Sequence, residues 1–166
     1  MKILKEEAVK EDIYFLKENL IKVHPDPFKF ISEEEFDKKI YQIINNPKCL
    51  EVPTFGINIM KLLSRLRDAH TCINILKAEN VFGKENFLFK FRFIDNSYFL
   101  VQSPAQLKDY LGAELIAIND TDVCTIEKCV QELIPLENET SLTYYLSSRI
   151  VEPVILNHYG LIDEIK

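Results

Sequence analysis

Glycine is scarce in this chain. Only four of the 166 residues are glycines, at positions 56, 83, 112 and 160, and no serine stands in a glycine-rich turn. A nucleophile elbow and an oxyanion hole both depend on the close backbone approach that glycines permit. The sequence therefore predicts that the chain holds no complete Ser or Cys triad of its own. Tryptophan is absent, so Phe and Tyr supply all the aromatic side chains.

Long apolar runs and basic clusters are absent as well. No run approaches the roughly 18 residues of a membrane span, and residues 1–7 turn acidic at once, without the apolar core of a signal peptide. The formal net charge is −6 at pH 7. With no basic patch to neutralise phosphates, the sequence argues against a nucleic-acid partner. We expect a cytoplasmic protein as the sequence stands, or a secreted or envelope protein if a leader has been removed.

Metal-ligand spacings are also missing. The four cysteines, Cys49, Cys72, Cys124 and Cys129, form no C-x-x-C pair, and a gap of five between the last two fits no common zinc site. The three histidines are far apart in sequence, so no i, i+4 helical zinc pair exists. We expect reduced thiols, with Cys72 on the buried face of a strand, and neither a metal site nor a cofactor.

Three helices are predicted first. Apolar side chains recur over residues 5–23 with a 4-3-4-3 spacing, which lines one helix face. Ser32 and Glu35 form a capping-box signature before a second helix, which ends near residues 45–47. A third helix is predicted over residues 53–67. Residues 1–72 are therefore expected to form a helical region.

After His70 the pattern changes to short strands. Residues 71–76 alternate loosely, and the turn at 95–97 and the run at 98–101 complete a hairpin. Its first strand is predicted over residues 86–94, where four phenylalanines recur at a period of two: Phe87, Phe89, Phe91 and Phe93. The remaining predicted elements are a short helix over 104–111, a strand over 113–118, and helices over 125–134, 140–151 and 154–159. The expected fold class is α+β, with a β-rich half at residues 73–166 that also contains short helices.

Four stretches, in their order and spacing, resemble the tail-specific (C-terminal-processing) serine peptidases, and most closely their tricorn-core-like branch. They are residues 16–20 followed by His24 and Pro25, residues 31–36, residues 62–71, and residues 111–119. The first three are similar to the helical region ahead of the peptidase domain. The fourth is similar to the part of a PDZ-like domain that is usually written G-D-x-I-x-x-I-N-G. The chain departs from the family at Arg67 and Asp120, where glycine is common.

The resemblance implies a chemical role for the sequence Asp68-Ala69-His70-Thr71. A histidine in this setting resembles the general base of the tricorn-like branch, and Asp68 would orient its ring. From the residues alone, His70 could instead hydrogen-bond the backbone at the helix end, with Asp68 capping the turn. In the family the nucleophilic Ser lies downstream in a separate catalytic core, which would be expected beyond Lys166. The resemblance therefore implies the amino-terminal, non-catalytic portion of a serine peptidase.

Peptide binding is the second role that the resemblance implies. PDZ-like modules take an extended peptide along a sheet edge, which would place the four phenylalanines, Leu111 and Gly112 beside a peptide or protein substrate. Alternatively, the phenylalanines are a buried strand face. A stand-alone peptide- or protein-binding module that has lost peptidase activity stays open as a second function. A missing catalytic core is a further expected partner, and exposed sheet edges allow a homo-oligomer.

Overall fold

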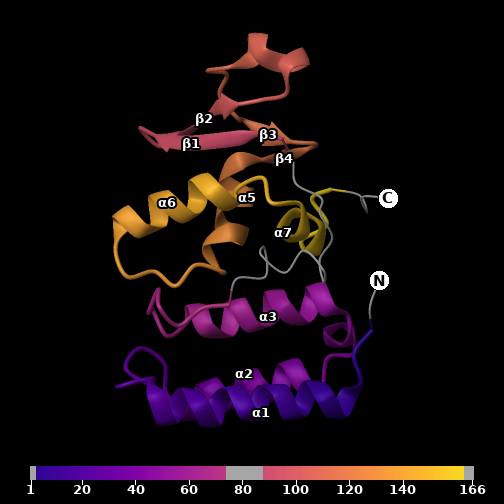
Figure 1. Cartoon of the computed structure of the whole chain (residues 1–166), viewed down its shortest axis with the longest axis vertical. Coiled ribbons are helices and arrows are strands. Elements are labelled where there is room, and N and C mark those ends of the chain that lie inside the picture. The colour runs from indigo at the N-terminus through magenta and orange to yellow at the C-terminus, as the bar shows by residue number, and fades with distance from the viewer. Residues whose placement is uncertain (1–2, 74–87, 163–166) are drawn as a thin grey trace.

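The structure is a computed structural model that describes residues 3–73 and 88–162. Figure 1 shows it as layers stacked along the longest axis. The layer at one end holds α1 (Glu6–Val23) and α2 (Glu33–Ile44). A 3₁₀ turn, η1 (Pro47–Leu50), then leads to α3 (Val52–Ser64), which forms the next layer. The Ser32 hydroxyl accepts the Glu35 N–H at 3.1 Å, so the predicted cap does begin α2.

The second half of the chain supplies the other layers. β1 (Lys90–Ile94) and β2 (Ser97–Gln102) form an antiparallel hairpin, followed by the 3₁₀ segment η3 (Ala105–Tyr110). The strands β3 (Ala117–Ile118) and β4 (Thr121–Asp122) form a second two-stranded sheet.

Three helices complete the fold: α5 (Val123–Gln131), α6 (Glu139–Arg149) and α7 (Pro153–His158). In Figure 1 they lie between α3 and the hairpin. The α+β class is confirmed at this level, as amino-terminal helices followed by small two-stranded sheets with short helices. A PDZ-like arrangement of the second half stays a prediction.

α3 is apolar on nearly every side and is buried between the two halves. Its Ile59, Leu62 and Leu63 pack into a hydrophobic cluster with α1 and α2. Its Ile57 and Met60 pack into a second cluster with the hairpin and α5–α7. A helix that is hydrophobic all round is stable when it is covered on all sides. α3 therefore joins the two clusters. The domain boundary expected between residues 72 and 73 stays a prediction.

The third helix is shorter than predicted and ends at Ser64. The N–H groups of Arg65, Leu66 and Arg67 donate to the carbonyls of Leu62, Leu63 and Ser64, three residues back. Such bonds tighten the last turn of a helix. Arg67 then takes a left-handed φ of 53°, which directs the chain out of the helix.

Two predicted strands also differ. Residues 71–73 belong to no strand, and residues 74–76 lie outside the described residues. The side chain of Cys72 is exposed, so its predicted burial is wrong. The strand predicted over 113–118 is reduced to β3, although Glu114 still bridges Phe99 and the Leu115 N–H donates to the Tyr98 carbonyl. Within residues 3–73 and 88–162, none of the helices has both the length and the apolar content that a membrane crossing requires.

Candidate functional site

The turn after α3 brings Asp68 and His70 together. The two carboxylate oxygens of Asp68 accept the His70 N–H at 2.9 Å and the Thr71 hydroxyl at 2.5 Å. The Nδ1 atom of the His70 ring lies 3.4 Å from Asp68 Oδ1. One carboxylate is therefore placed both to cap the turn and to orient the ring, the two roles that the sequence left open.

His24 and Glu137 complete this cluster, and sequence reasoning gave neither of them a functional role. His24 Nε2 lies 3.2 Å from Asp68 Oδ2, while its Nδ1 accepts the Asp26 N–H at 3.1 Å, which places the ring proton on Nε2. Glu137 Oε1 accepts the Ala69 N–H at 2.7 Å and lies 3.8 Å from His70 Nδ1. The position of His24 before Pro25, in a stretch that resembles the family, was the available signal. The sequence contained no comparable signal for Glu137.

The charge state of Asp68 follows from these contacts. The Thr71 hydroxyl and the His70 N–H hold the pKa of the Asp68 carboxyl at about 2, below its ordinary value of 3.8, although burial acts in the opposite direction. The His70 side chain is 92% exposed. Because Nδ1 faces the carboxylates and Nε2 lies on the far edge of the ring, Nε2 is open to solvent. The turn therefore presents an imidazole nitrogen with a fixed carboxylate behind it.

No serine hydroxyl is paired with His70. Ser64 is 9% exposed, and its hydroxyl lies 2.9 Å from the Lys61 carbonyl and 2.7 Å from the Glu132 carbonyl. The other six serine hydroxyls also make structural hydrogen bonds: Ser32, Ser97, Ser103, Ser141, Ser147 and Ser148. All seven lie in the part of the chain that the structure describes. The cluster therefore has a candidate base and no serine beside it.

The same cluster is the group that could hold a cation. One ligand atom each from Asp68, His70 and Glu137 lies within 4.8 Å of the others. However, Asp68 Oδ1 and Glu137 Oε1 each already accept a backbone N–H. The geometry is explained by these hydrogen bonds alone, and the expected absence of a metal stays a prediction.

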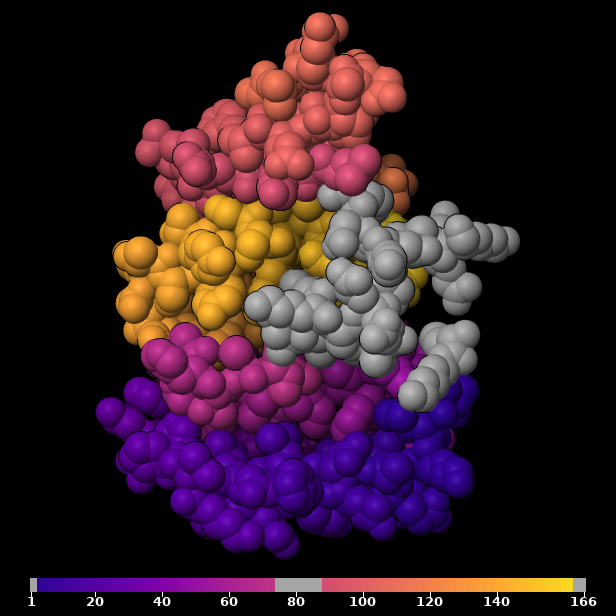
Figure 2. All heavy atoms as spheres, in the orientation of Figure 1, coloured from indigo at the N-terminus to yellow at the C-terminus, as the bar shows by residue number. Residues whose placement is uncertain are grey.

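Three of the predicted peptide-binding residues meet in one groove. Phe89, Phe91 and Phe93 line a groove of about 820 Å³ between β1 and α6, opposite Tyr144 and Ser147. In Figure 2 the surfaces of the hairpin and of α6 adjoin. Phe87 lies outside the described residues.

Leu111 and Gly112 lie elsewhere. The Gly112 N–H donates to the Leu100 carbonyl at 2.8 Å, on the edge of β2 that faces away from β1. Gly112 has a φ of 86°, a left-handed conformation that suits glycine. These two residues are therefore separated from the groove by the hairpin itself, and they do not line it.

The outer edge of β1 is partly open toward the groove. The Phe93 N–H donates to the Ser147 hydroxyl of α6 at 2.9 Å, so the backbone of Phe93 points away from β2. Because strand residues alternate and no bulge separates Phe91 from Phe93, the backbone of Phe91 points the same way.

Comparisons of the chain with models of protein families, with curated proteins and with solved structures find no match.

Proposed function

We propose that this chain is the amino-terminal, non-catalytic portion of a tricorn-like C-terminal-processing serine peptidase, and that it binds peptide substrates or gates their access. The observation that carries the proposal is the exposed His70 ring, with its Nδ1 atom beside the carboxylates of Asp68 and Glu137. A carboxylate at Nδ1 favours the tautomer with its proton there and leaves the Nε2 lone pair to accept a proton.

The nucleophile in this proposal comes from a catalytic core. A general base acts only within hydrogen-bond reach of the hydroxyl that it activates. An exposed Nε2 atom is accessible to a serine carried by another domain, whereas a buried one would not be. The serines of the described residues are hydrogen-bonded elsewhere, which supports a division of the catalytic groups between this chain and the core.

The groove between β1 and α6 supports peptide binding. An extended peptide beside β1 would receive and donate main-chain hydrogen bonds at Phe91, and its side chains would contact the aromatic lining. Fluorescence anisotropy with a library of fluorescent, unstructured peptides measures this peptide binding directly. Replacing Tyr144, which is 70% exposed in the groove, by alanine should weaken binding about ten-fold, as loss of an exposed aromatic anchor does. Tyr41→Ala, at a side chain that is 69% exposed on α2, is the matched control.

Catalysis is tested separately from binding. We expect the purified chain to cleave no peptide and to resist labelling by a fluorophosphonate, because no serine is paired with His70. Labelling of any serine, together with peptide hydrolysis by this chain alone, would contradict the proposal. His70→Ala should leave peptide affinity unchanged.

The alternative is a stand-alone peptide-binding module without peptidase chemistry. The structural hydrogen bonds of all seven serine hydroxyls are compatible with it, since they leave no serine hydroxyl beside His70 within the described residues. The two functions differ in what the gene encodes after Lys166. A downstream reading frame with a Gly-flanked Ser, whose protein loses activity when His70 is changed to Ala, supports the peptidase portion. A frame without such a serine, combined with peptide binding, supports the module.

A further inference from the structure

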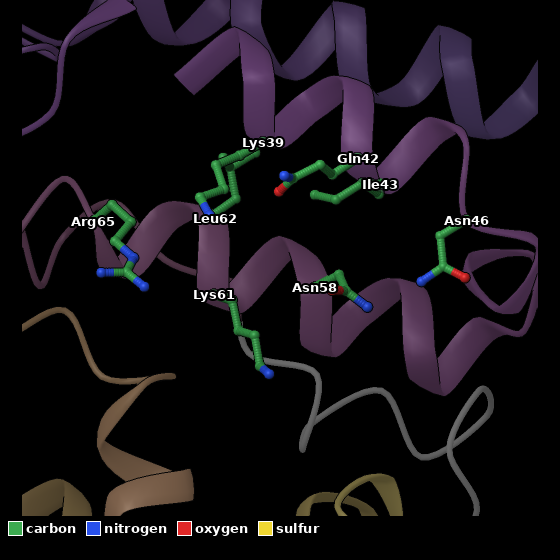
Figure 3. A pocket seen from close by; sticks show the side chains of 8 residues that line it. All are labelled: Lys39, Gln42, Ile43, Asn46, Asn58, Lys61, Leu62 and Arg65. Carbon is green, nitrogen blue, oxygen red and sulfur yellow. The ribbon is translucent and has the colours of Figure 1, made fainter. Parts of the chain in front are cut away.

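A pocket between α2 and α3 gathers basic and carboxamide side chains. Its volume is about 180 Å³. Figure 3 shows its polar lining, which comes from α2, from α3 and from residues just after each helix: Lys39, Gln42, Asn46, Asn58, Lys61 and Arg65. Ile43 and Leu62 supply the apolar part, and none of the lining residues is acidic. Such a lining is unexpected in a chain whose net charge is −6.

The three cations of the pocket differ in their partners. The Lys61 ammonium pairs with Glu132 at 3.1 Å and lies 4.6 Å from the Tyr159 ring centre, and Figure 3 shows it turned away from α2. The ammonium of Lys39 and the guanidinium of Arg65 make no ion pair within residues 3–73 and 88–162, although the Arg65 charge helps to lower the pKa of the Glu132 carboxyl. In Figure 3, Lys39 reaches from α2 toward Leu62 at the end of the pocket that Arg65 occupies. Two positive charges that form no ion pair within the described residues therefore lie at one end.

The opposite end of the pocket presents a fixed amide donor. Asn46 Oδ1 accepts the Lys48 N–H at 3.0 Å, and this bond determines which way the carboxamide faces. Figure 3 shows the Asn46 amide nitrogen turned toward the pocket. Asn58 is anchored by donating one N–H to the Thr54 carbonyl at 2.8 Å, which leaves its second N–H available. The pocket thus offers hydrogen-bond donors at both ends and charge at one.

We propose that this pocket binds a small phosphate-bearing molecule. A phosphate monoester carries about −1.5 to −2 charges at neutral pH and three strong acceptor oxygens, which match the cations of Lys39 and Arg65 and several N–H donors. A planar guanidinium suits two phosphate oxygens at once, while an ammonium supplies a compact charge. Ligand pockets for drug-sized molecules are about 300–1,000 Å³. A pocket of about 180 Å³ is therefore suited to the phosphate with a short organic group attached.

The test titrates inorganic phosphate and glycerol 3-phosphate against the full chain, with sodium chloride added to hold the ionic strength constant. We expect saturable binding that raises the melting temperature and shifts the Asn46 side-chain amide resonances. The double variant Lys39→Ala with Arg65→Ala should bind at least about ten-fold more weakly, as loss of a charge-assisted hydrogen bond does. The matched control is Lys22→Ala with Lys38→Ala, which removes the same charge from exposed residues of α1 and α2.

Three outcomes would overturn the proposal. They are equal stabilisation by chloride at the same ionic strength, an equal loss of affinity in the control double variant, and Asn46 resonances that do not move. The first two would mean that the chain responds to ionic strength or net charge rather than to a built site. Tighter binding of glycerol 3-phosphate than of inorganic phosphate supports an organic phosphate ligand, and the reverse order supports the free anion.

Discussion

Asp68 should stabilise the fold through its charge, and its replacement by asparagine tests this. The variant Asp68→Asn keeps the shape of the side chain and removes the negative charge that faces His24, His70 and Thr71. The pKa of the Asp68 carboxyl is lowered from 3.8 to about 2. A difference of this size corresponds to about 2.5 kcal/mol, since one pKa unit is worth about 1.4 kcal/mol. Solvent screening at a side chain that is 26% exposed reduces it to about 1–2 kcal/mol.

The sign of the pH dependence follows from the lowered pKa. A carboxyl group with a lower pKa in the folded state stabilises the protein fully at pH values above its unfolded pKa of 3.8, and the stabilisation is lost as the pH falls toward about 2. Urea unfolding of the wild type and of Asp68→Asn should therefore differ by about 1–2 kcal/mol at pH 7, and the gap should narrow below about pH 4 and close near about pH 2.

Asp120→Asn is the matched control for this experiment. Asp120 is exposed, and its side chain makes no hydrogen bond or ion pair within residues 3–73 and 88–162. The Asp120→Asn variant should unfold like the wild type at every pH. A gap for Asp68→Asn that stays constant from pH 7 to about pH 2.5 would refute the reasoning, because it would arise from shape or packing rather than from charge.

Three further predictions concern the burial of two cysteines, the hairpin turn and the end of α3. Cys72 is exposed whereas Cys49 is 1% exposed with its thiol pKa raised by burial, so an aromatic disulfide reagent should label Cys72 in the folded chain and Cys49 only after unfolding, as mass spectrometry would report. Asn96 has a φ of 64°, so Asn96→Val should lower the free energy of unfolding by about 1 kcal/mol in urea, while Asn96→Gly should not. Ser64→Ala should cost about 1 kcal/mol, because it removes the hydroxyl that bonds to the Glu132 carbonyl; unchanged urea stability would contradict that role.

The helices and the hairpin could be predicted because their signals are local. The 4-3-4-3 spacing over residues 5–23 lies on one face of α1, where Val9, Ile13 and Leu20 are buried. Ser32 caps α2 through a bond that spans three residues. The hairpin turn follows from Asp95 and Asn96, both of which take left-handed conformations that short polar residues tolerate. Each of these features is decided within one or two turns of backbone.

The boundaries that failed depend on packing against distant segments. Ser64 is buried at the end of α3 because the residue after α5 brings the Glu132 carbonyl against its hydroxyl. Cys72 was expected in a strand, but strand pairing requires a partner, and residues 71–73 pair with no strand among residues 3–73 and 88–162. Periodicity cannot report whether a neighbour will be present.

The sequence by itself determined the order of helices and strands and singled out Asp68 and His70 as neighbours, because their chemistry is contained in a single turn. Only the tertiary structure decided what surrounds them. His24 reaches Asp68, and Glu137 reaches Ala69 across 68 residues of chain, through the packing of α3 between the two halves. The pocket of Lys39, Asn46 and Arg65 likewise exists only where α2 lies against α3. Hydrogen bonds and charges that join distant segments form after the core has packed, so no local pattern encodes them.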